Sequence, residues 1–289
     1  MIRASELILN EDQSIYHLHL RPEQIAETII TVGDPNRVAQ VSKYFDQIDF
    51  VLSKREFVTH TGRIGNKRLS VISTGIGPDN IDIVLNELDA LFNIDFETRQ
   101  AKPKLTKLAF IRIGTSGSLQ ENIPVDAMLT STYGIALDNL MSFYNFSLSS
   151  SEQNLNAALK SAIPGLPGQP FVFKAPGQLM RLFGDSFFKG ITLTCPGFYG
   201  PQGRRLRIDS VLSGAIFEQL RSFHIGDQHV TNMEMETAAI YGLAGLLGHE
   251  AVSCNAILAN RALGTFSKEP MKAVEQLILR VLEALAENH

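Results

Sequence analysis

The alternation of strand-like and helix-like segments most constrains what this chain can fold into. Residues 27–32 are rich in β-branched side chains and end at Gly33, and a helical pattern begins at Pro35. Between Ile81 and Phe92 the apolar residues recur every three or four positions, which is typical of an amphipathic helix. The alternation predicts an α/β protein with a central sheet.

The same alternation continues to the end of the chain. We expect further strands at residues 57–60, 67–74, 105–113, 127–133 and 251–259, and helices at residues 152–162, 234–247 and 268–287. The sequence therefore predicts a single domain over residues 1–289, in which helices flank a mixed, twisted sheet. Residues 141–190 contain a serine-rich stretch and a loop rich in proline and glycine, so we expect an irregular insertion there.

Composition and charge exclude several classes of protein. The 289 residues carry 26 basic and 30 acidic side chains, a net charge of −4, which gives no general reason to bind nucleic acid. No run of 18 apolar residues predicts a membrane span, and the N-terminus has no signal-peptide core. Cys195 and Cys254 form no CxxC motif, so we expect no disulfide framework or zinc ribbon and a cytoplasmic location.

Two strand ends are candidate anion sites. In Gly33-Asp34-Pro35-Asn36-Arg37, a glycine ends a strand and an arginine lies in the first turn of a helix, where free N–H groups attract anions. The alternative is a tight turn with a solvated arginine.

The second candidate is Ile111-Arg112-Ile113-Gly114-Thr115-Ser116-Gly117. Arg112 lies in an otherwise apolar strand, so it needs an anionic partner, either a protein carboxylate or a ligand. Thr115 and the backbone at Gly114 and Gly117 are suited to surround a phosphate. The segment has neither the Walker pattern nor the dinucleotide-binding glycine pattern.

Glu236 is a candidate sugar ligand. On the helix predicted from residue 234 it is in line with Ile240, Leu243 and Leu247, an apolar row. A carboxylate there needs hydrogen-bond donors, and sugar hydroxyls supply them; the alternative is a paired core carboxylate. We expect Glu234 to point elsewhere and to serve structure.

The segment Phe198-Tyr199-Gly200-Pro201-Gln202-Gly203-Arg204 is a candidate base site. An amide and a guanidinium match a planar ring with adjacent C=O and N–H groups, and Phe198 can contact its face or edge. The alternative is a surface turn with a basic tail. The histidines show no metal-binding helix spacing and no serine-nucleophile motif is present, so we expect no metal site and no serine hydrolase.

Together these segments resemble the uridine phosphorylase branch of the nucleoside phosphorylase superfamily. The matching motifs run in the family's order from Tyr16-His17-Leu18 to Asn260-Arg261 and so span nearly the whole chain. The run Thr74-Gly75-Ile76-Gly77-Pro78-Asp79 departs from the family's usual sequence after its second glycine. The resemblance implies a sheet that closes into a distorted barrel.

The resemblance also implies roles for individual residues. Gly33, Arg37, Arg112, Gly114 and Thr115 correspond to the phosphate site, with Arg55 added by a neighbouring subunit. His17 of that neighbour corresponds to a contact with the ribose 5′-hydroxyl, and Met235 and Glu236 to the other ribose contacts. Phe198, Gln202 and Arg204 correspond to the uracil pocket, and Arg261 to a water-bridged base contact.

The implied reaction is reversible phosphorolysis of uridine to uracil and ribose 1-phosphate, extending to deoxyuridine or thymidine. Its catalytic residues would be Arg37, Arg112, Gln202, Arg204 and Glu236. Phosphate would be a co-substrate, no redox cofactor would be needed, and a monovalent cation would fit near Glu56. A homo-oligomer is implied, either a dimer or a hexamer built from dimers. A purine nucleoside phosphorylase, a nucleosidase and a non-enzymatic nucleoside-binding protein are the alternatives, although Asn260-Arg261 replaces the aspartate of purine-cleaving relatives.

Overall fold

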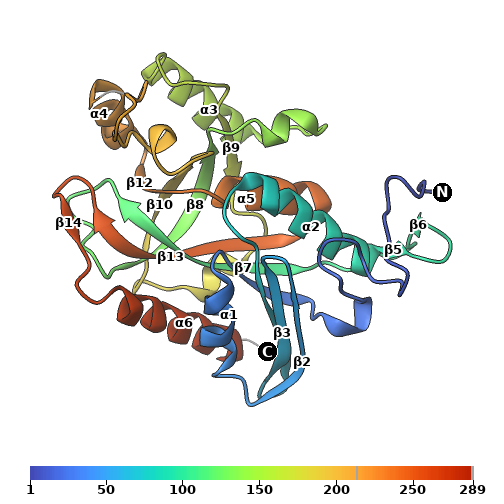
Figure 1. The fold of residues 1–289 in the computed structure, drawn as a ribbon. Helices are drawn as coiled ribbons and strands as arrows, with labels where there is room; N and C mark the ends of the chain where they lie inside the picture. The colour runs from blue at the N-terminus through green and yellow to red at the C-terminus, as the bar shows by residue number, and fades with distance from the viewer. Residues whose placement is uncertain (213, 288–289) are drawn as a thin grey trace.

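A computed structural model describes residues 1–212 and 214–287, and it shows a mixed sheet flanked by helices (Figure 1). The helices are α1 (Pro35–Ser42), α2 (Pro78–Asn93), α3 (Ser150–Ala162), α4 (Gly214–Ser222), α5 (Thr237–Leu247) and α6 (Pro270–Glu287). The first strands are β1 (Thr28–Val32), β2 (Gln47–Lys54), β3 (Phe57–Ile64), β4 (Lys67–Ser73), β5 (Ile94–Asp95), β6 (Gln100–Ala101) and β7 (Ala109–Ser118). The later ones are β8 (Met128–Ala136), β9 (Phe171–Lys174), β10 (Phe188–Thr194), β11 (His224–Ile225), β12 (Gln228–Glu234), β13 (Glu250–Asn260) and β14 (Thr265–Phe266).

The main sheet closes on itself at one end. Its strand order is β11-β12-β10-β8-β13-β7-β1-β4-β3-β2, and β12 also pairs with β7. Strands β12, β10, β8, β13 and β7 therefore form a closed, barrel-like ring, while β1, β4, β3 and β2 extend it as an open sheet. The ring contains both parallel and antiparallel pairs. The predicted α/β class, with a mixed sheet and a distorted barrel, is confirmed.

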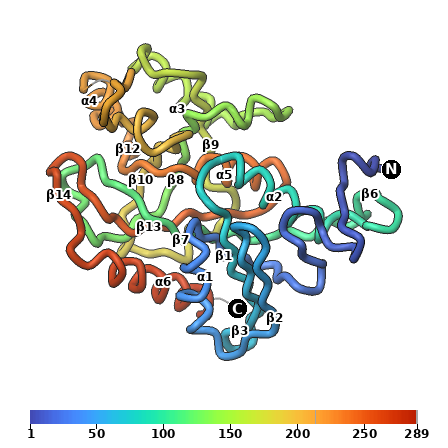
Figure 2. The backbone as a smooth tube through the Cα atoms, viewed as in Figure 1, coloured from blue at the N-terminus to red at the C-terminus, as the bar shows by residue number. Residues whose placement is uncertain are grey.

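The helices bury three apolar layers against this sheet. Helices α2 and α5 pack against each other over one face, around residues such as Leu88 and Ile240 (Figures 1 and 2). Helices α1 and α6 cover the opposite face around Val38 and Leu277. The layer that contains α3 and α4 lies beside β10 and β12. The apolar spacing therefore determines which side of each helix faces the core.

The predicted C-terminal helix illustrates this rule. In α6 the residues Ala273, Val274, Leu277, Ile278, Val281, Leu282 and Leu285 are buried, as the spacing indicates. Met271, expected on the same stripe, is 63% exposed because it lies in the first turn of the helix, beyond the edge of the sheet contact.

Residues 141–190 contain regular structure as well as loops. Helix α3 begins with a capping box in which Ser149 and Glu152 exchange side-chain and backbone hydrogen bonds. Strand β9 then pairs antiparallel with β8 and adds to the sheet. That this segment forms one domain with the rest of the chain remains a prediction.

No helix among residues 1–212 and 214–287 is both long enough and apolar enough to cross a bilayer.

A buried carboxylate follows strand β8. Asp138 is 6% exposed; its Oδ1 atom accepts the Leu140 N–H at 2.9 Å, but Oδ2 has no hydrogen-bond partner in the described part of the chain. Burial raises the pKa of Asp138. The folded state therefore holds this proton more tightly than the unfolded state, and stability is lost as the pH rises through the folded-state pKa.

We expect Asp138→Asn to increase the free energy of unfolding by about 1–3 kcal/mol at roughly pH 8, because it removes an unsatisfied buried charge and keeps the acceptor for Leu140. The gain should shrink at roughly pH 4, where the wild-type carboxyl becomes protonated. Urea unfolding at both pH values measures this, and a gain that does not depend on pH would contradict it.

Candidate functional site

One cavity of about 800 Å³ collects most of the predicted site residues. Gly33, Arg37, Arg112, Thr115, Phe198, Gln202, Arg204, Met235 and Glu236 all line it. They come from strands, loops and the start of α1, which are far apart in the sequence, so the fold itself assembles the site. Gly114, His17, Arg55 and Arg261 are not among the lining residues.

Three helices begin at this cavity. The residues that precede α1, α2 and α5 all contribute to its wall: Gly33 and Asp34, Gly75 and Ile76, and Met235 and Glu236. Helix N-termini carry free N–H groups and partial positive charge. The cavity is therefore suited to an anion before any arginine is considered.

Arg37 extends from the first turn of α1 into the cavity wall. Its Nη1 atom donates to the Ile113 carbonyl at 3.4 Å, and its buried Nε atom has no partner among the described residues. Burial lowers the pKa of Arg37, and repulsion from Arg112 lowers it further. Arg37 is therefore half-buried in the cavity wall rather than fully solvated, and its contact with phosphate remains a prediction.

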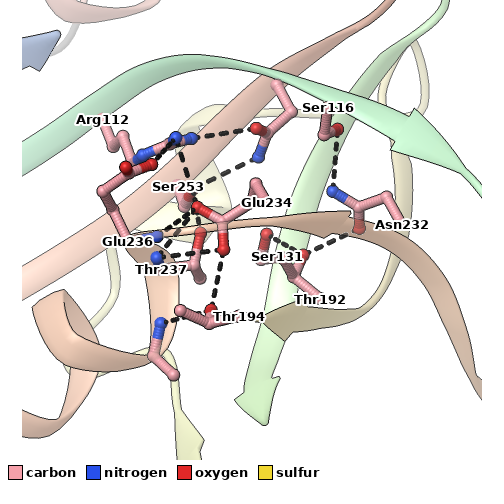
Figure 3. Close-up of polar contacts among 12 residues, drawn as sticks. Arg112, Ser116, Ser131, Thr192, Thr194, Asn232, Glu234, Glu236, Thr237 and Ser253 are labelled. Atoms are coloured by element: carbon pink, nitrogen blue, oxygen red, sulfur yellow. Dashed lines mark hydrogen bonds and ion pairs between the residues drawn. The ribbon is translucent and has the colours of Figure 1, made fainter. Parts of the chain in front are cut away.

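Arg112 lies at the centre of the sheet and is paired with protein carboxylates (Figure 3). Its Nη2 atom lies 2.5 Å from Glu236 Oε2 and 3.2 Å from Glu234 Oε2, and Nη1 donates to Asn255 at 2.9 Å. Burial opposes the charged form, but the two glutamates outweigh it and raise the pKa of Arg112. Of the two partners that the sequence allowed, the protein carboxylate is thus confirmed.

Gly114 supports this arrangement without lining the cavity. A Cβ atom at Gly114 would lie 1.8 Å from Nη1 of Arg112. Only a residue without a side chain lets the guanidinium fold over the strand at this point. Gly114 therefore acts through Arg112.

The prediction for the helix that contains Glu236 needs correction. Helix α5 begins at Thr237, with Glu236 in the N-cap position, while Glu234 is the last residue of β12. Glu236 is therefore not part of an apolar helical row. Its Oε1 atom accepts the Gly77 N–H at 2.9 Å, and burial raises its pKa, although Arg112 acts in the opposite direction.

Glu234 does not point away from the site, contrary to expectation. Besides its contact with Arg112, its Oε2 atom accepts the N–H groups of Glu236 at 3.0 Å and Thr237 at 2.9 Å (Figure 3). Glu234 thus satisfies the free N–H groups at the start of α5, which is the structural role expected of it, and neutralises Arg112 as well.

Carboxylates of the same chain neutralise the two arginines at the end of the cavity that contains Arg37 and Arg112. Arg37 and Arg112 face Glu234 and Glu236, and Asp34 also lines the cavity and attracts Arg37, so the two arginines leave no excess positive charge. The N–H groups that begin α5 already donate to Glu234, so a phosphate dianion added here would be bound more tightly with a further cation.

The segment around Gln202 forms a second polar group in the same cavity. Gln202 is 3% exposed, and its Oε1 atom accepts from Arg204 Nη1 at 2.5 Å. The same guanidinium lies 3.7 Å from the centre of the Phe198 ring and donates to the Phe198 carbonyl at 2.7 Å. The surface-turn alternative is therefore wrong for Gln202, which is buried and held in place.

Arg261 lies behind this group. It donates to the Gln202 carbonyl at 2.6 Å and packs over the Phe217 ring at 4.3 Å. Burial, and then the charge of Arg204, lower the pKa of Arg261 to about 10. Arg261 therefore supports the backbone of Gln202, and its water-bridged contact with a base remains a prediction.

His17 and Arg55 lie away from the cavity of their own chain. His17 is in the N-terminal segment and contacts Glu87, and Arg55 is an exposed residue in the turn between β2 and β3. The resemblance assigns both to a neighbour's site, and this remains a prediction. Glu56 does line the cavity, but a cation near it also remains a prediction.

Several lining residues were not predicted from the sequence. Gly75 and Ile76 come from the connection between β4 and α2, and Asn80 comes from the first turn of α2. A second group, from β12, β13 and β14, consists of Met233, Leu258, Ala259 and Phe266. The first group had a signal: a glycine at a strand end, followed by a proline at the start of a helix, repeats the pattern at Gly33 and Pro35. The second group had none, because these apolar residues match ordinary strand positions.

Comparisons with known proteins add an independent line of evidence. A family model described as the phosphorylase superfamily matches residues 27–287. A uridine phosphorylase of Thermococcus kodakarensis is 28% identical over 286 residues, covering 98% of this chain and 91% of the relative. A DeoD-type purine nucleoside phosphorylase of Bacillus cytotoxicus is 26% identical over 275 residues, covering 93% of this chain and 97% of the relative. The crystal structure of a Trypanosoma brucei nucleoside phosphorylase, reported to show uridine phosphorylase activity, is 29% identical with a TM-score of 0.88 and covers 97% of this chain and 99% of that one.

Proposed function

The chain belongs to the phosphorylase superfamily, and we propose that it catalyses the reversible phosphorolysis of uridine to uracil and ribose 1-phosphate. The observation that carries this proposal is that two separate groups of polar residues line one cavity. Arg37, Arg112 and Glu236 form one group, and Phe198, Gln202 and Arg204 form the other. The first has the chemistry for phosphate and sugar, and the second has the chemistry for a pyrimidine. The chain is thus a pentosyltransferase, as the resemblance implied.

In the proposed reaction, phosphate lies below C1′ of the ribose. The C1′–N1 bond breaks, its electron pair stays on uracil N1, and a phosphate oxygen forms the new bond to C1′. Arg37 and Arg112 hold the dianion, whose charge stabilises the positive charge that develops on the ribose ring. Gln202 and Arg204 donate hydrogen bonds to the uracil as it becomes negative. Glu236 accepts from a ribose hydroxyl on the 2′ side, and Met235 contacts the sugar.

The surroundings of the base group favour a pyrimidine. Asn260 donates from Nδ2 to the carbonyls of Gln120 and Ile123, each at 2.9 Å, so its amide is fixed to the backbone. By the family resemblance, purine-cleaving relatives have an aspartate in the region that here reads Asn260-Arg261. Without that carboxylate, the site lacks the group that would hold a proton on a purine N7.

The quaternary and ionic requirements belong to the same proposal. Arg55 and His17 of a neighbouring subunit would complete each site, which requires a homo-oligomer, and phosphate would be the co-substrate. The charge balance between Arg37, Arg112 and the two glutamates supports an additional arginine, since a bound dianion otherwise leaves the site with excess negative charge. No redox cofactor is part of the reaction.

The base specificity is tested with uridine, thymidine, inosine and adenosine as substrates at saturating phosphate. We expect base release to be fastest from uridine. Faster release from inosine or adenosine would favour a purine nucleoside phosphorylase instead. Ligand-induced thermal stabilisation without base release would indicate a nucleoside-binding protein.

Removing the buried amide should weaken uracil recognition. We expect Gln202→Ala to lower kcat/KM for uridine by about a hundredfold, because hydrogen bonds to the base are lost in a site shielded from water. For a nucleoside that the wild type cleaves poorly, such as inosine, kcat/KM should fall much less. The ratio of kcat/KM for uridine to that for inosine should therefore decrease. The exposed Gln153→Ala in α3 is the matched control, and an unchanged base preference in Gln202→Ala would contradict the assignment.

A further inference from the structure

The N-terminal segment is attached to helix α2 through one carboxylate. Glu87 accepts three N–H groups from a segment 69 and 70 residues earlier in the sequence: His17 N at 3.0 Å, Leu18 N at 2.9 Å and His17 Nδ1 at 2.6 Å. The Glu87 side chain is 13% exposed and that of His17 is 31% exposed. The contact is therefore shielded on the carboxylate side and open on the imidazole side.

Helix α2 makes this attachment rigid. It spans Pro78–Asn93 and buries one face against α5. Leu88, which follows Glu87 in the sequence, is part of the core. The Tyr16 ring lies edge-on to the imidazole with ring centres 4.7 Å apart. The imidazole is thus held on one side by a carboxylate from a core helix and on another by an aromatic ring.

The hydrogen bond to Glu87 decides which nitrogen carries the proton. A carboxylate accepts, so Nδ1 of His17 is the donor and carries hydrogen. In the neutral imidazole the lone pair is then on Nε2. Nε2 has no hydrogen-bond partner within residues 1–212 and 214–287, and the ring is not part of the wall of its own chain's cavity.

We propose that Glu87 is a positioning residue, which orients His17 and fixes its tautomer so that Nε2 accepts a hydrogen bond from the 5′-hydroxyl of a nucleoside in the neighbouring subunit's site. This inference rests on the proposed function. It gives the enzyme selectivity for nucleosides with a free 5′-hydroxyl, and it places one determinant of that selectivity on α2, remote from the cavity of its own chain.

The test compares uridine with 5′-deoxyuridine in wild type and in Glu87→Gln. Glutamine keeps an oxygen for the backbone N–H groups, but its amide can donate to Nδ1 and so favours the opposite tautomer. We expect KM for uridine to rise about tenfold with little change in kcat, because one hydrogen bond to the substrate is lost. The kinetic constants for 5′-deoxyuridine should stay within about twofold of wild type, since that substrate lacks the hydroxyl.

Two further measurements separate positioning from a purely structural role. In a His17→Ala background, Glu87→Gln should have no additional effect on KM for uridine. Nitrogen NMR of the His17 ring should show the proton on Nδ1 in wild type and on Nε2 in the variant, whatever the substrate. Glu218→Gln, which removes an exposed carboxylate on α4, is the matched control.

The outcomes distinguish this inference from the function on which it rests. If wild type does not cleave uridine, the proposed function fails, while the NMR result still decides whether Glu87 sets the tautomer. If wild type cleaves uridine but Glu87→Gln impairs uridine and 5′-deoxyuridine equally, Glu87 only anchors the N-terminal segment and the inference is overturned. An unchanged tautomer in the variant overturns it as well.

Discussion

Arg37→Ala is expected to lower kcat/KM for phosphate-dependent uridine cleavage by about a thousandfold, because it removes a preorganised charge at the phosphate. The same change should leave stability nearly unaltered. Arg37 makes one long hydrogen bond, to Ile113 O at 3.4 Å, and its buried Nε atom is without a partner among the described residues. Burial and repulsion from Arg112 lower its pKa against the attraction of Asp34 and Glu236, so the charged guanidinium gives the folded state no net stabilisation. Steady-state kinetics at varied phosphate, together with thermal unfolding, measure the two effects.

The controls for Arg37 isolate the guanidinium. Arg37→Lys keeps a charge but loses the paired donors, and it should recover only part of the activity. Arg63→Ala removes a half-exposed arginine on β3 and should change neither quantity. If Arg37→Ala retains activity within a few-fold of wild type, Arg37 does not hold phosphate.

Arg112→Ala should have a larger total effect than Arg37→Ala, because it is expected to reduce both turnover and the stability of the fold. Removing Arg112 leaves Glu234, Glu236 and Asn255 buried without their shared partner. Breaking a buried ion pair from one side costs about 3–5 kcal/mol. Phosphate-dependent turnover should fall at least as far as in Arg37→Ala. Urea unfolding at equilibrium gives the stability and initial rates give the turnover.

A double substitution separates the two roles of Arg112. Arg112→Met with Glu236→Gln removes one buried charge of each sign and should recover part of the stability lost in Arg112→Ala. It should recover no turnover, since the phosphate ligand and the ribose acceptor are both changed. If Arg112→Ala is as stable as wild type, the ion pair seen in Figure 3 contributes nothing to folding and this account of Arg112 is wrong.

The sequence predicts the parts of the fold that apolar periodicity specifies. The α6 stripe from Ala273 to Leu285 and the strand that ends at Gly33 follow from side-chain spacing alone. Strands β10 and β12 do not, because polar residues fill the ring there: Thr192 and Asn232 are fully buried and hydrogen-bond each other at 2.8 Å. Cross-strand hydrogen bonds satisfy these residues, and a pattern of apolar residues carries no information about such pairs.

The candidate site could likewise be predicted from the sequence only in part. The sites at Gly33 and Gly114 were visible in the sequence because glycine and arginine are unusual there. The predicted break at Gly114 was wrong, however, because β7 continues through it to Ser118. The partners of Arg112 were not, because Glu236 was assigned to a helix that in fact begins at Thr237. Such an assignment depends on where β12 ends. Glu234 ends that strand, caps α5 three residues later and contacts Arg112 on the distant strand β7.

The phosphate requirement of uridine cleavage is the most direct test of the account. Uracil release is followed while phosphate is raised from zero, and ribose 1-phosphate is quantified in the same samples. We expect no release without phosphate, a saturable increase with phosphate, and one ribose 1-phosphate for each uracil. Uracil release at an undiminished rate in phosphate-free buffer, with free ribose as the product, would contradict it.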